Sequence, residues 1–579
     1  MTKVLVSGAT GTIGRPLVNQ LEEAGADVRT VTRRLTDPVA LEAALDGVDA
    51  VFLLWPFDSV EGVHEVVELI GARRVVYLSS AAARPHEVEI ERLIAGTARE
   101  WTVLRPHAFA ANTLRWADQV RAGVVRQPYG DVAFAPVHER DVAGVAVRAL
   151  LGEGHHGVVH TLTGPRTLTQ REQARAIGAA IGRPVRWEEE PPEEARRRLL
   201  GLGWPAPVVD GTLRGLAEPG PVTGTAEEVT GAPASTFETW ASEHAADFLG
   251  TMRAARIHEY GDASVISLDE VPVPRPGPGE VLIRVTATSF NPSEAGLRMG
   301  LLRDVLGVTL PHTLGWDVAG TVVTGAGDLA PGDRVIGLID GAAAEYAVAK
   351  ASMLTRAPER MALAAAAAVP VAGLTAWQAV FEHARIGRGS RVLINGAGGG
   401  VGLFAVQLAK LAGAHVVATA GPRSAAAVRA LGADEVVDYT TDALPGGNDV
   451  LINLVPDVPA SVTELAEEFV SITQPIVHPR AVRFVARNDP GQLTELVALI
   501  DKGLVDVEAA VRPLESLADL HREAERGLVR GKVVLTVEPR RLSDVGRRSP
   551  RPDRPGVAGR ACRCRIRGAS PAERAGRRA

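Results

Sequence analysis

Two glycine-rich segments, separated by almost four hundred residues, constrain the fold of this 579-residue chain more than any other feature. They read GATGTIG at residues 8–14 and GAGGGVG at residues 396–402. Each follows a short apolar run, at residues 3–6 and 391–394, and precedes a stretch with the apolar spacing of a helix. Glycines in a turn between a strand and a helix let the backbone approach a pyrophosphate, and the helix N-terminus offers unpaired N–H groups to it. The sequence therefore predicts two dinucleotide-binding sites.

The composition is that of a globular protein, with 46% hydrophobic and 23% charged residues, and the length suits about three or four folding units. The net charge of −6 argues against nucleic acid as the main partner. There is no signal-peptide pattern and no run of ~18 uncharged apolar residues, so we expect a soluble, cytoplasmic protein without a membrane partner. Both cysteines, Cys562 and Cys564, lie near the C-terminus, which excludes a disulfide framework.

The pattern of apolar runs and turn residues predicts an α/β fold class with two Rossmann-type, doubly wound parallel sheets, the second paired with a β-barrel. In the first unit, strands are expected at residues 3–7, 28–32, 49–54, 73–78 and 101–104, with helices between them. Short strands with Pro/Gly turns follow from residue 252, and alternation of strands and helices returns at 375–500. The expected domains are 1–249 (Rossmann with a small C-terminal cap), 252–374 plus 505–538 (barrel), 375–504 (second Rossmann) and 540–579 (disordered tail).

The tail carries 13 arginines against three acidic residues, a charge of +10 that leaves −16 on the rest of the chain. It is either a basic arm for nucleic acid or acidic lipid, or an extension that cannot bury a core and has no binding role. The second interpretation is favoured, because a basic segment without aromatic residues carries little recognition information.

Five motifs within residues 1–249 point to a family. They are the loop at 8–14, DGVDAVFLL at 46–54, VYLSS at 76–80, WTVLRP at 101–106 and LTGP at 162–165. Together they resemble the NmrA-like branch of the atypical short-chain dehydrogenases. The resemblance implies a Rossmann fold with a small cap and NAD(P) bound at Gly8, Thr10, Gly11, Thr12, Ile13 and Gly14.

The second expected strand of this half ends at Thr32-Arg33-Arg34, without a carboxylate. An acidic residue there would hold the ribose 2′-hydroxyl of NAD, whereas an arginine can pair with the 2′-phosphate of NADP. Arg33 is therefore a predicted NADP contact, with a solvated strand end as the alternative.

Two departures from the family pattern count against catalysis in the N-terminal half. Residues 81–92 contain neither the tyrosine nor the lysine of the usual Tyr-x-x-x-Lys pair. The chain also passes from Arg33 almost directly to an expected helix at 39–45, where family members have a further helix and strand. Either the outer strand of the sheet is lost or the site is impaired.

Residues 252–538 contain a denser set of motifs. They are PGPGEVLI at 276–283, SFNPSE at 289–294, GWDVAG at 315–320, PGDRV at 331–335, GLTAW at 373–377, the loop at 399–402, LGAD at 431–434 and GKVVL at 531–535. This set resembles the zinc-independent medium-chain dehydrogenase/reductases of the quinone oxidoreductase-like branch, which implies a GroES-like barrel beside a Rossmann domain.

The resemblance also implies cofactor contacts, at Thr375, Gly399, Gly400, Val401 and Gly402. The second strand of this Rossmann unit ends near Arg423 and Ser424, again without an acid, and both side chains can bind a 2′-phosphate. The family pattern places Tyr439 near the same phosphate and Asn291 near the nicotinamide. Core packing of Tyr439 and a simple turn at Asn291 are the alternatives.

No metal site is expected, because residues 252–538 contain no cysteine and their six histidines lack ligand spacing. Without a metal to polarise a carbonyl, hydride transfer suits acceptors whose product anions are delocalised, such as quinones and α,β-unsaturated carbonyls.

The predicted function is therefore NADPH-dependent hydride transfer to a small molecule, a quinone or an α,β-unsaturated carbonyl, through the C-terminal half. No side chain is identified as a general acid. The alternative is a regulatory protein that senses NADP(H) through the N-terminal half, and a third reading makes the halves two sequential enzymes. Reductases of this type commonly dimerise, so a homodimer is expected, and the physiological substrate is left open.

Overall fold

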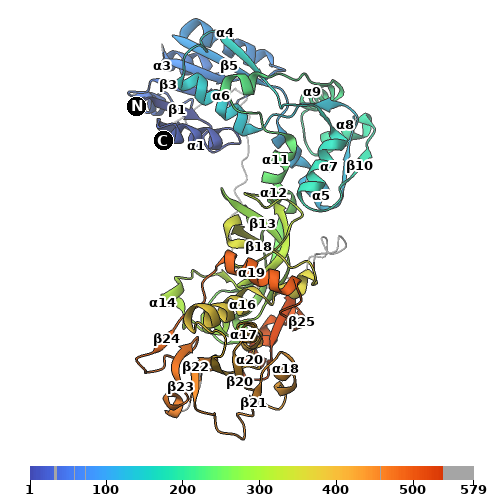
Figure 1. The fold of residues 1–579 in the computed structure, drawn as a ribbon. Coiled ribbons are helices and arrows are strands. Elements are labelled where there is room, and N and C mark those ends of the chain that lie inside the picture. Colours follow the sequence, from blue (N-terminus) through green and yellow to red (C-terminus); the bar gives the residue numbers. More distant parts are fainter. Residues whose placement is uncertain (32–34, 58, 72, 457, 459, 539–579) are drawn as a thin grey trace, which may run out of the picture. The chain divides into compact units, whose positions relative to one another are not determined.

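The computed structural model describes residues 1–31, 35–57, 59–71, 73–456, 458 and 460–538 (Figure 1). The predicted contact Arg33 and the predicted tail at 540–579 lie outside these residues.

The N-terminal half is built on a six-stranded parallel sheet with the order β2-β1-β3-β4-β5-β8. Its strands are β1 (Lys3–Ser7), β2 (Asp27–Val31), β3 (Ala50–Leu54), β4 (Arg74–Leu78), β5 (Glu100–Pro106) and β8 (Val158–Leu162). The five strands predicted from the sequence agree with these bounds to within two residues. Because β2 is the edge strand, the described residues place no strand outside it: the shortened segment has removed the outer strand of the sheet.

Helices cover both faces of this sheet, as a doubly wound fold requires. They are α1 (Gly14–Glu23), α2 (Pro38–Leu45), α3 (Val63–Ile70), α4 (Pro85–Thr97) and α6 (Glu139–Leu151). One apolar cluster joins Leu17 of α1 and Val142 of α6 to the sheet, and another joins Leu41 of α2 and Ile90 of α4 to the opposite face.

The remainder of the first 249 residues is mostly helical, as expected for a cap. The elements are α5 (Ala117–Arg121), α7 (Gln170–Ala180), α8 (Pro192–Gly201), α9 (Ala206–Ala217), α10 (Thr225–Thr230), α11 (Phe237–Glu243), α12 (Ala245–Leu249) and the paired strands β6 (Val124–Gln127) with β10 (Arg186–Glu189) and β7 (Ala133–Phe134) with β9 (Leu168–Thr169).

A second parallel sheet, with the order β21-β20-β19-β22-β23-β24, lies in the C-terminal half (Figure 1). Its strands are β19 (Arg391–Asn395), β20 (His415–Thr419), β21 (Glu435–Val437), β22 (Asn448–Asn453), β23 (Ala466–Ser471) and β24 (Ala481–Arg483). The strand order reverses between β19 and β22. In sheets of this type a ligand binds in the crevice outside the carboxyl ends of the strands at that reversal.

The helices of this half are α13 (Pro292–Arg298), α14 (Arg303–Leu306), α15 (Leu363–Ala366), α16 (Pro370–Trp377), α17 (Gly400–Leu411), α18 (Ala425–Ala430), α19 (Pro490–Asp501) and α20 (Leu517–Glu525). Several begin at a proline, which has the helical φ and lacks an N–H that would be unpaired in the first turn. Apolar residues of α16, α17 and α19 form the largest core cluster with the parallel sheet.

Short, largely antiparallel strands make up the region in which the barrel was predicted. The main sheet has the order β18-β16-β15-β13-β26-β25, with β17 also paired to β13. Its strands are β13 (Glu280–Ser289), β15 (Asp317–Thr324), β16 (Arg334–Leu338), β17 (Tyr346–Lys350), β18 (Leu354–Arg356), β25 (Ala509–Pro513) and β26 (Lys532–Thr536). A three-stranded sheet of β11 (Thr251–Ile257), β12 (Ile266–Pro272) and β14 (His312–Thr313) completes the region. No helix among the described residues is long and apolar enough to cross a membrane.

Candidate active site

The glycine-rich loop of the C-terminal half connects β19 to α17. Gly396, the first residue after β19, has a φ of +93°, in the left-handed region that favours glycine. A Cβ on Gly402 would lie 2.5 Å from the Gly396 carbonyl oxygen, so the close backbone crossing leaves no room for a side chain. Helix α17 begins at Gly400, and its N-cap, Gly399, provides no side-chain cap. A tight turn leading into an uncapped helix N-terminus fits a pyrophosphate.

Buried polar side chains fix the start of this loop. Thr419, the last residue of β20, accepts a hydrogen bond from the Gly396 N–H over 2.8 Å. The same hydroxyl donates to Asn395 Oδ1, at the end of β19, over 2.9 Å. The carboxyl ends of the two neighbouring strands are thereby held to the first residue of the loop.

Three predicted contacts for a 2′-phosphate lie on or beside the segment that follows β20. Ser424 packs against the loop, because a Cβ on Gly398 would lie 2.3 Å from Ser424 Oγ. Arg423 is exposed, and no hydrogen bond or ion pair engages its guanidinium within the described part of the chain. Tyr439 is 61% exposed, so it is not a core residue, and its hydroxyl lies 3.5 Å from the position of a Cβ on Gly421. A cation and two hydroxyls near the end of β20 fit the extra phosphate of NADP.

Asn291 belongs to a buried polar cluster. Its Nδ2 donates to Asp317 Oδ2 over 2.9 Å and to Glu294 Oε1 over 3.1 Å, and its Oδ1 accepts from Lys532 Nζ over 2.9 Å. Asn291, Glu294, Asp317 and Lys532 are each at most 5% exposed. Asn291 occupies the N-cap position of α13, but its side chain makes no cap bond there. Its side chain thus belongs to this cluster and does not merely begin a turn.

The carboxylate of Asp317 is the hub of the cluster. Besides Asn291, its Oδ2 accepts from the Ser289 hydroxyl and, over 3.2 Å, from Lys532 Nζ. Its Oδ1 accepts from the Val371 N–H over 2.7 Å, which ties β15 to α16. The predicted contact Thr375 lies on the same helix, and its hydroxyl donates back to the Val371 carbonyl over 2.6 Å. The Thr375 hydroxyl is therefore bound to its own helix, and Val371 links it to the cluster.

Glu294 is the second carboxyl group of the cluster. Its burial, opposed by the hydrogen bond from Asn291 and reinforced by the charge of Asp317, raises the pKa of Glu294 to about 8. Glu294 is therefore mostly protonated at neutral pH, and the cluster pairs one ammonium with one carboxylate.

Sequence reasoning missed four members of this cluster, which are Ser289, Glu294, Asp317 and Lys532. Each lies inside a motif that was recognised as a family match but not as a functional residue. A signal was present, because Asp317 and Lys532 are charged residues that open apolar strand segments, and Lys532 is one of only five lysines in the chain.

The N-terminal glycine-rich loop has the same local geometry. Gly8 has a φ of +69°, and a Cβ on Gly14 would lie 2.1 Å from the Gly8 carbonyl oxygen. Helix α1 begins at Gly14 without a side-chain cap from Ile13, and Thr10, Gly11 and Thr12 are exposed. The loop fits a pyrophosphate, and among the described residues no strand lies outside β2.

Helix α4, in the segment that contains neither the tyrosine nor the lysine of the usual catalytic pair, carries Glu87 and Glu91. Glu91 Oε1 accepts from the Ser79 hydroxyl over 2.5 Å and from Arg105 Nε over 3.0 Å. Ser79, at the end of β4, therefore takes part in an ion-paired network. Within the described residues, no group of three or more His, Cys, Asp or Glu could hold a metal ion.

Comparisons with known protein families agree with these two halves. The alcohol dehydrogenase GroES-like domain matches residues 277–359, the zinc-binding dehydrogenase family matches 400–464, and the NAD dependent epimerase/dehydratase family matches 4–100.

Three curated relatives are oxidoreductases. A chloroplast envelope quinone oxidoreductase homolog of Arabidopsis thaliana is 40% identical over 233 residues, which is 37% of this chain and 71% of the relative. A (4-alkanoyl-5-oxo-2,5-dihydrofuran-3-yl)methyl phosphate reductase of Streptomyces griseus is 38% identical over 282 residues, 42% of this chain and 99% of the relative. An NAD(P)H azoreductase of Xenophilus azovorans is 33% identical over 282 residues, which is 42% of this chain and 99% of the relative. The chain therefore belongs to the NAD(P)-dependent oxidoreductases, with a C-terminal half of the quinone oxidoreductase-like medium-chain family and an N-terminal half of the NmrA-like, epimerase-type short-chain family.

Proposed function

We propose that the C-terminal half is an NADPH-dependent reductase of quinones or α,β-unsaturated carbonyls. The observation that supports the proposal is Arg423, an exposed cation that has no partner among the residues the structure describes and that follows β20 next to Ser424. NADPH has a phosphate to place there and NADH does not. When bound, the cofactor would supply a hydride, while the chain binds and orients it.

The class of acceptor follows from the hydrogen-bond inventory of the buried cluster. Both Nδ2 hydrogens of Asn291, the Ser289 hydroxyl and the Lys532 ammonium are all engaged by protein acceptors. These groups have no donor to spare for a negative charge that develops on a substrate oxygen. A substrate that delocalises this charge over its own conjugated system suits such a site. The quinone oxidoreductase homolog named above acts, by its name, on a quinone, which is a conjugated acceptor.

The N-terminal half is proposed to be a second dinucleotide-binding module of doubtful catalytic competence. The matches to the two relatives extend over 282 positions but include only 42% of this chain, roughly 240 residues. About forty positions of each match therefore have no counterpart in this chain. A domain that has lost its outer strand and the preceding helix would show such a shortfall, because a parallel crossover takes a dozen or more residues. We therefore assign these reductase relatives to the N-terminal half. Its engaged Ser79 and missing tyrosine favour binding without turnover, as in an NADP(H) sensor.

A homodimer is expected to form along β24, the edge strand of the C-terminal parallel sheet. Val482, on this strand, and Val485, just after it, are exposed. An apolar edge strand is a template for pairing with a second copy.

The experiment compares two substitutions that place one carboxylate in each loop. Gly399→Asp adds a favoured N-cap residue to α17, whose N-cap has an extended backbone, so the helix should remain folded while the charge repels a phosphate. Thr12→Asp adds a carboxylate at an exposed position of the N-terminal loop, just before the N-cap residue Ile13 of α1. NADPH oxidation would be followed by absorbance with 1,4-naphthoquinone and with 2-cyclohexenone, with NADH as the second donor.

We expect turnover that prefers NADPH, is abolished by Gly399→Asp and is retained in Thr12→Asp. Turnover that survives Gly399→Asp and is lost in Thr12→Asp would move the activity to the N-terminal half. If the wild-type chain binds NADPH but reduces neither acceptor, the sensor becomes the better description.

A further inference from the structure

Lys532 carries an ammonium that is buried at one end of the cofactor region. It is 5% exposed, and its Nζ donates to Asn291 Oδ1 over 2.9 Å, to Asp317 Oδ2 over 3.2 Å and to the Phe290 carbonyl over 3.5 Å. An ammonium has three N–H groups, and each has one acceptor here. The cation is therefore fully used within the protein and is not available to bind a phosphate.

The stem of the same side chain lies against the beginning of α17. A Cβ on Gly400, the first residue of this helix, would lie 2.8 Å from Lys532 Cδ and 2.9 Å from its Cγ. The residue before Lys532 adds a backbone link, because Gly531 and Gly399 form a parallel bridge. Lys532 thus contacts the glycine-rich loop with its stem and the Asn291 cluster with its charged end.

The ammonium also determines which way the Asn291 amide faces. With Oδ1 toward Lys532, both Nδ2 hydrogens point to carboxyl groups, of Asp317 and Glu294. The flipped amide would place its N–H groups against the ammonium of Lys532 and its oxygen against the carboxylate of Asp317, so both of these contacts would become repulsive. Only the second lone pair of Oδ1 remains for a ligand, and it can accept a hydrogen bond but cannot donate one.

We propose that Lys532 is a positioning residue that couples the glycine-rich loop to Asn291 and fixes the Asn291 amide as an acceptor for the carboxamide N–H of a nicotinamide. The inference rests on the proposed NADPH site. It separates two regions of that site: Lys532 controls the nicotinamide side, whereas Arg423, Ser424 and Tyr439 serve the 2′-phosphate without it.

The test uses two ligands that differ by the nicotinamide. NADPH contains it, and adenosine 2′,5′-bisphosphate retains only the adenosine with its two phosphates. The dissociation constants of both would be measured by calorimetry on the full chain carrying Thr12→Asp, so that only the C-terminal loop contributes.

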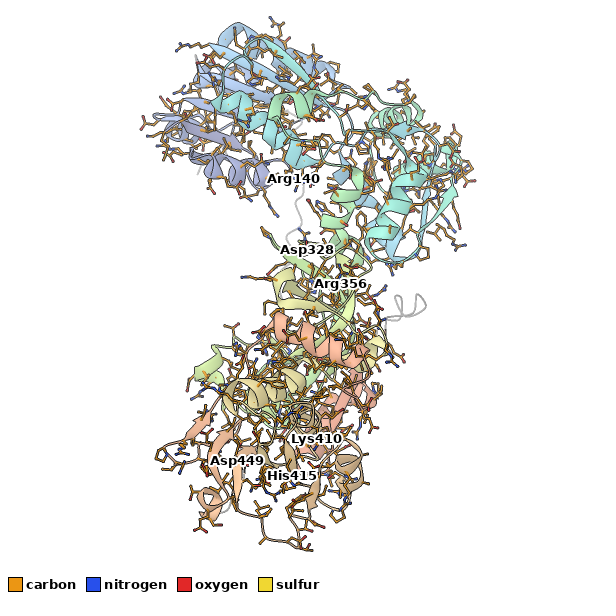
Figure 2. The ribbon with its side chains drawn as sticks, in the orientation of Figure 1. Arg140, Asp328, Arg356, Lys410, His415 and Asp449 are labelled. Carbon is orange, nitrogen blue, oxygen red and sulfur yellow. The ribbon has the colours of Figure 1, made fainter. Side chains whose placement is uncertain are left out.

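The variant is Lys532→Met combined with Asp317→Asn. Removal of the ammonium alone would leave a buried carboxylate without its partner, whereas the double substitution removes both charges together and should preserve folding. Lys410→Met is the matched control. Lys410 lies on α17, the helix that begins at Gly400, and forms an ion pair with Asp434 over 2.7 Å. His415 lies 3.9 Å from the same carboxylate, so Asp434 keeps a neighbour when Lys410 is replaced (both residues are labelled in Figure 2).

The double variant is expected to bind NADPH about tenfold more weakly, the effect of one lost hydrogen bond, and adenosine 2′,5′-bisphosphate within about twofold of the unaltered protein. The control should bind both ligands normally. Equal weakening of both ligands would show a merely structural role for Lys532, and unchanged NADPH binding in a folded variant would overturn the coupling. If the Thr12→Asp protein with Lys532 intact binds neither ligand, the failure lies in the proposed NADPH site.

Discussion

Asn395 and Asn453 join the carboxyl ends of β19 and β22 by a buried hydrogen bond, in which Asn395 Nδ2 donates to Asn453 Oδ1 over 2.9 Å. These are the two strands between which the order of the C-terminal parallel sheet reverses, so the bond spans the opening of the crevice. With Thr419, the two asparagines form a chain of side-chain hydrogen bonds that ends at the first residue of the glycine-rich loop.

Replacement of Asn395 by leucine should therefore reduce both stability and cofactor affinity. The change leaves the Thr419 hydroxyl without its acceptor and Asn453 Oδ1 without its donor, and each buried unsatisfied group costs about 1–3 kcal/mol. Urea unfolding and NADPH titration would measure the two effects. Asn488→Leu is the control, because among the described residues Asn488 donates to the Met353 carbonyl and not to the loop, so the change should lower stability without altering NADPH binding.

Arg423→Ala is expected to remove most of the preference for NADPH. Because the exposed guanidinium has no partner within the described residues, its loss should leave the fold intact. A charge-assisted hydrogen bond to a phosphate is worth about 1.5–3 kcal/mol, so the dissociation constant of NADPH should rise roughly tenfold to a hundredfold while that of NADH stays constant. Arg429→Ala, an exposed arginine in the last turn of α18, should change neither value. An equal effect of the two substitutions would refute the specific role of Arg423.

His244 should make the protein less stable as the pH rises. The imidazole lies between Glu139, 2.9 Å from Nε2, and Asp247, 2.8 Å from Nδ1. Burial acts to lower the pKa of His244, but the two carboxylates outweigh it and raise the pKa to about 9. Since the unfolded chain has a pKa near 6.5, the stabilisation is complete below that pH and is lost as the pH rises to about 9, by at most about 3 kcal/mol.

Chemical unfolding at pH 6, 7.5 and 9 would measure this loss. In His244→Gln the free energy of unfolding should be lower at pH 6 and should fall less steeply toward pH 9. Parallel curves for the variant and the unaltered protein would contradict the assignment of this slope to His244.

Glu294→Gln should increase the stability of the protein, whereas His244→Gln should decrease it. The unfolded carboxyl group ionises near pH 4.5, whereas the buried one keeps its proton up to about pH 8. The unfolded state therefore binds fewer protons in this range, and the folded state loses stability as the pH rises from 4.5 to 8. Glutamine cannot ionise and still accepts from Asn291, so the variant should gain stability relative to the unaltered protein over this range.

A carboxyl group with the opposite shift provides the comparison for Glu294. Hydrogen bonds from Arg487 lower the pKa of Glu382, so its stabilising contribution is present at neutral pH and is lost on acidification. Glu382→Gln should accordingly lose stability at neutral pH. A gain in both variants would show that the effect of Glu294→Gln is unrelated to its burial.

The fold could be predicted from the sequence where local patterns determine it. Each strand of the N-terminal parallel sheet that was expected is an apolar, β-branched run between turn residues, and β1 and β3 match to within one residue. The glycine-rich loops could also be predicted from the sequence, because a positive φ at Gly396 and the absence of space at Gly402 require glycine at those positions. The loss of the outer strand beyond β2 was visible only as one of two alternatives, since length alone does not say which element is missing.

The buried cluster could not be predicted in the same way. Asn291, Asp317 and Lys532 come from three segments of the barrel region that are distant in sequence, and no local spacing relates them. Their proximity depends on the pairing of β13 with β15 and with β26, which is a tertiary property. Tyr439 illustrates the same limit, because its strand-end position suited either a core residue or a ligand contact until its exposure was known.

The pairing of β26 with β13, in which Thr536 lies opposite Ala287, affects how the protein is made. A chain emerging from the ribosome completes Asn291, Asp317 and the whole glycine-rich loop long before it supplies Lys532. Until then Asp317 has no cation to neutralise it, and the beginning of α17 lacks the strand that lies against it. Contacts between segments so distant in sequence form slowly. The C-terminal loop should therefore become able to bind cofactor only after β26 has been made and paired, and chains that end before Lys532 should not bind NADPH through this loop.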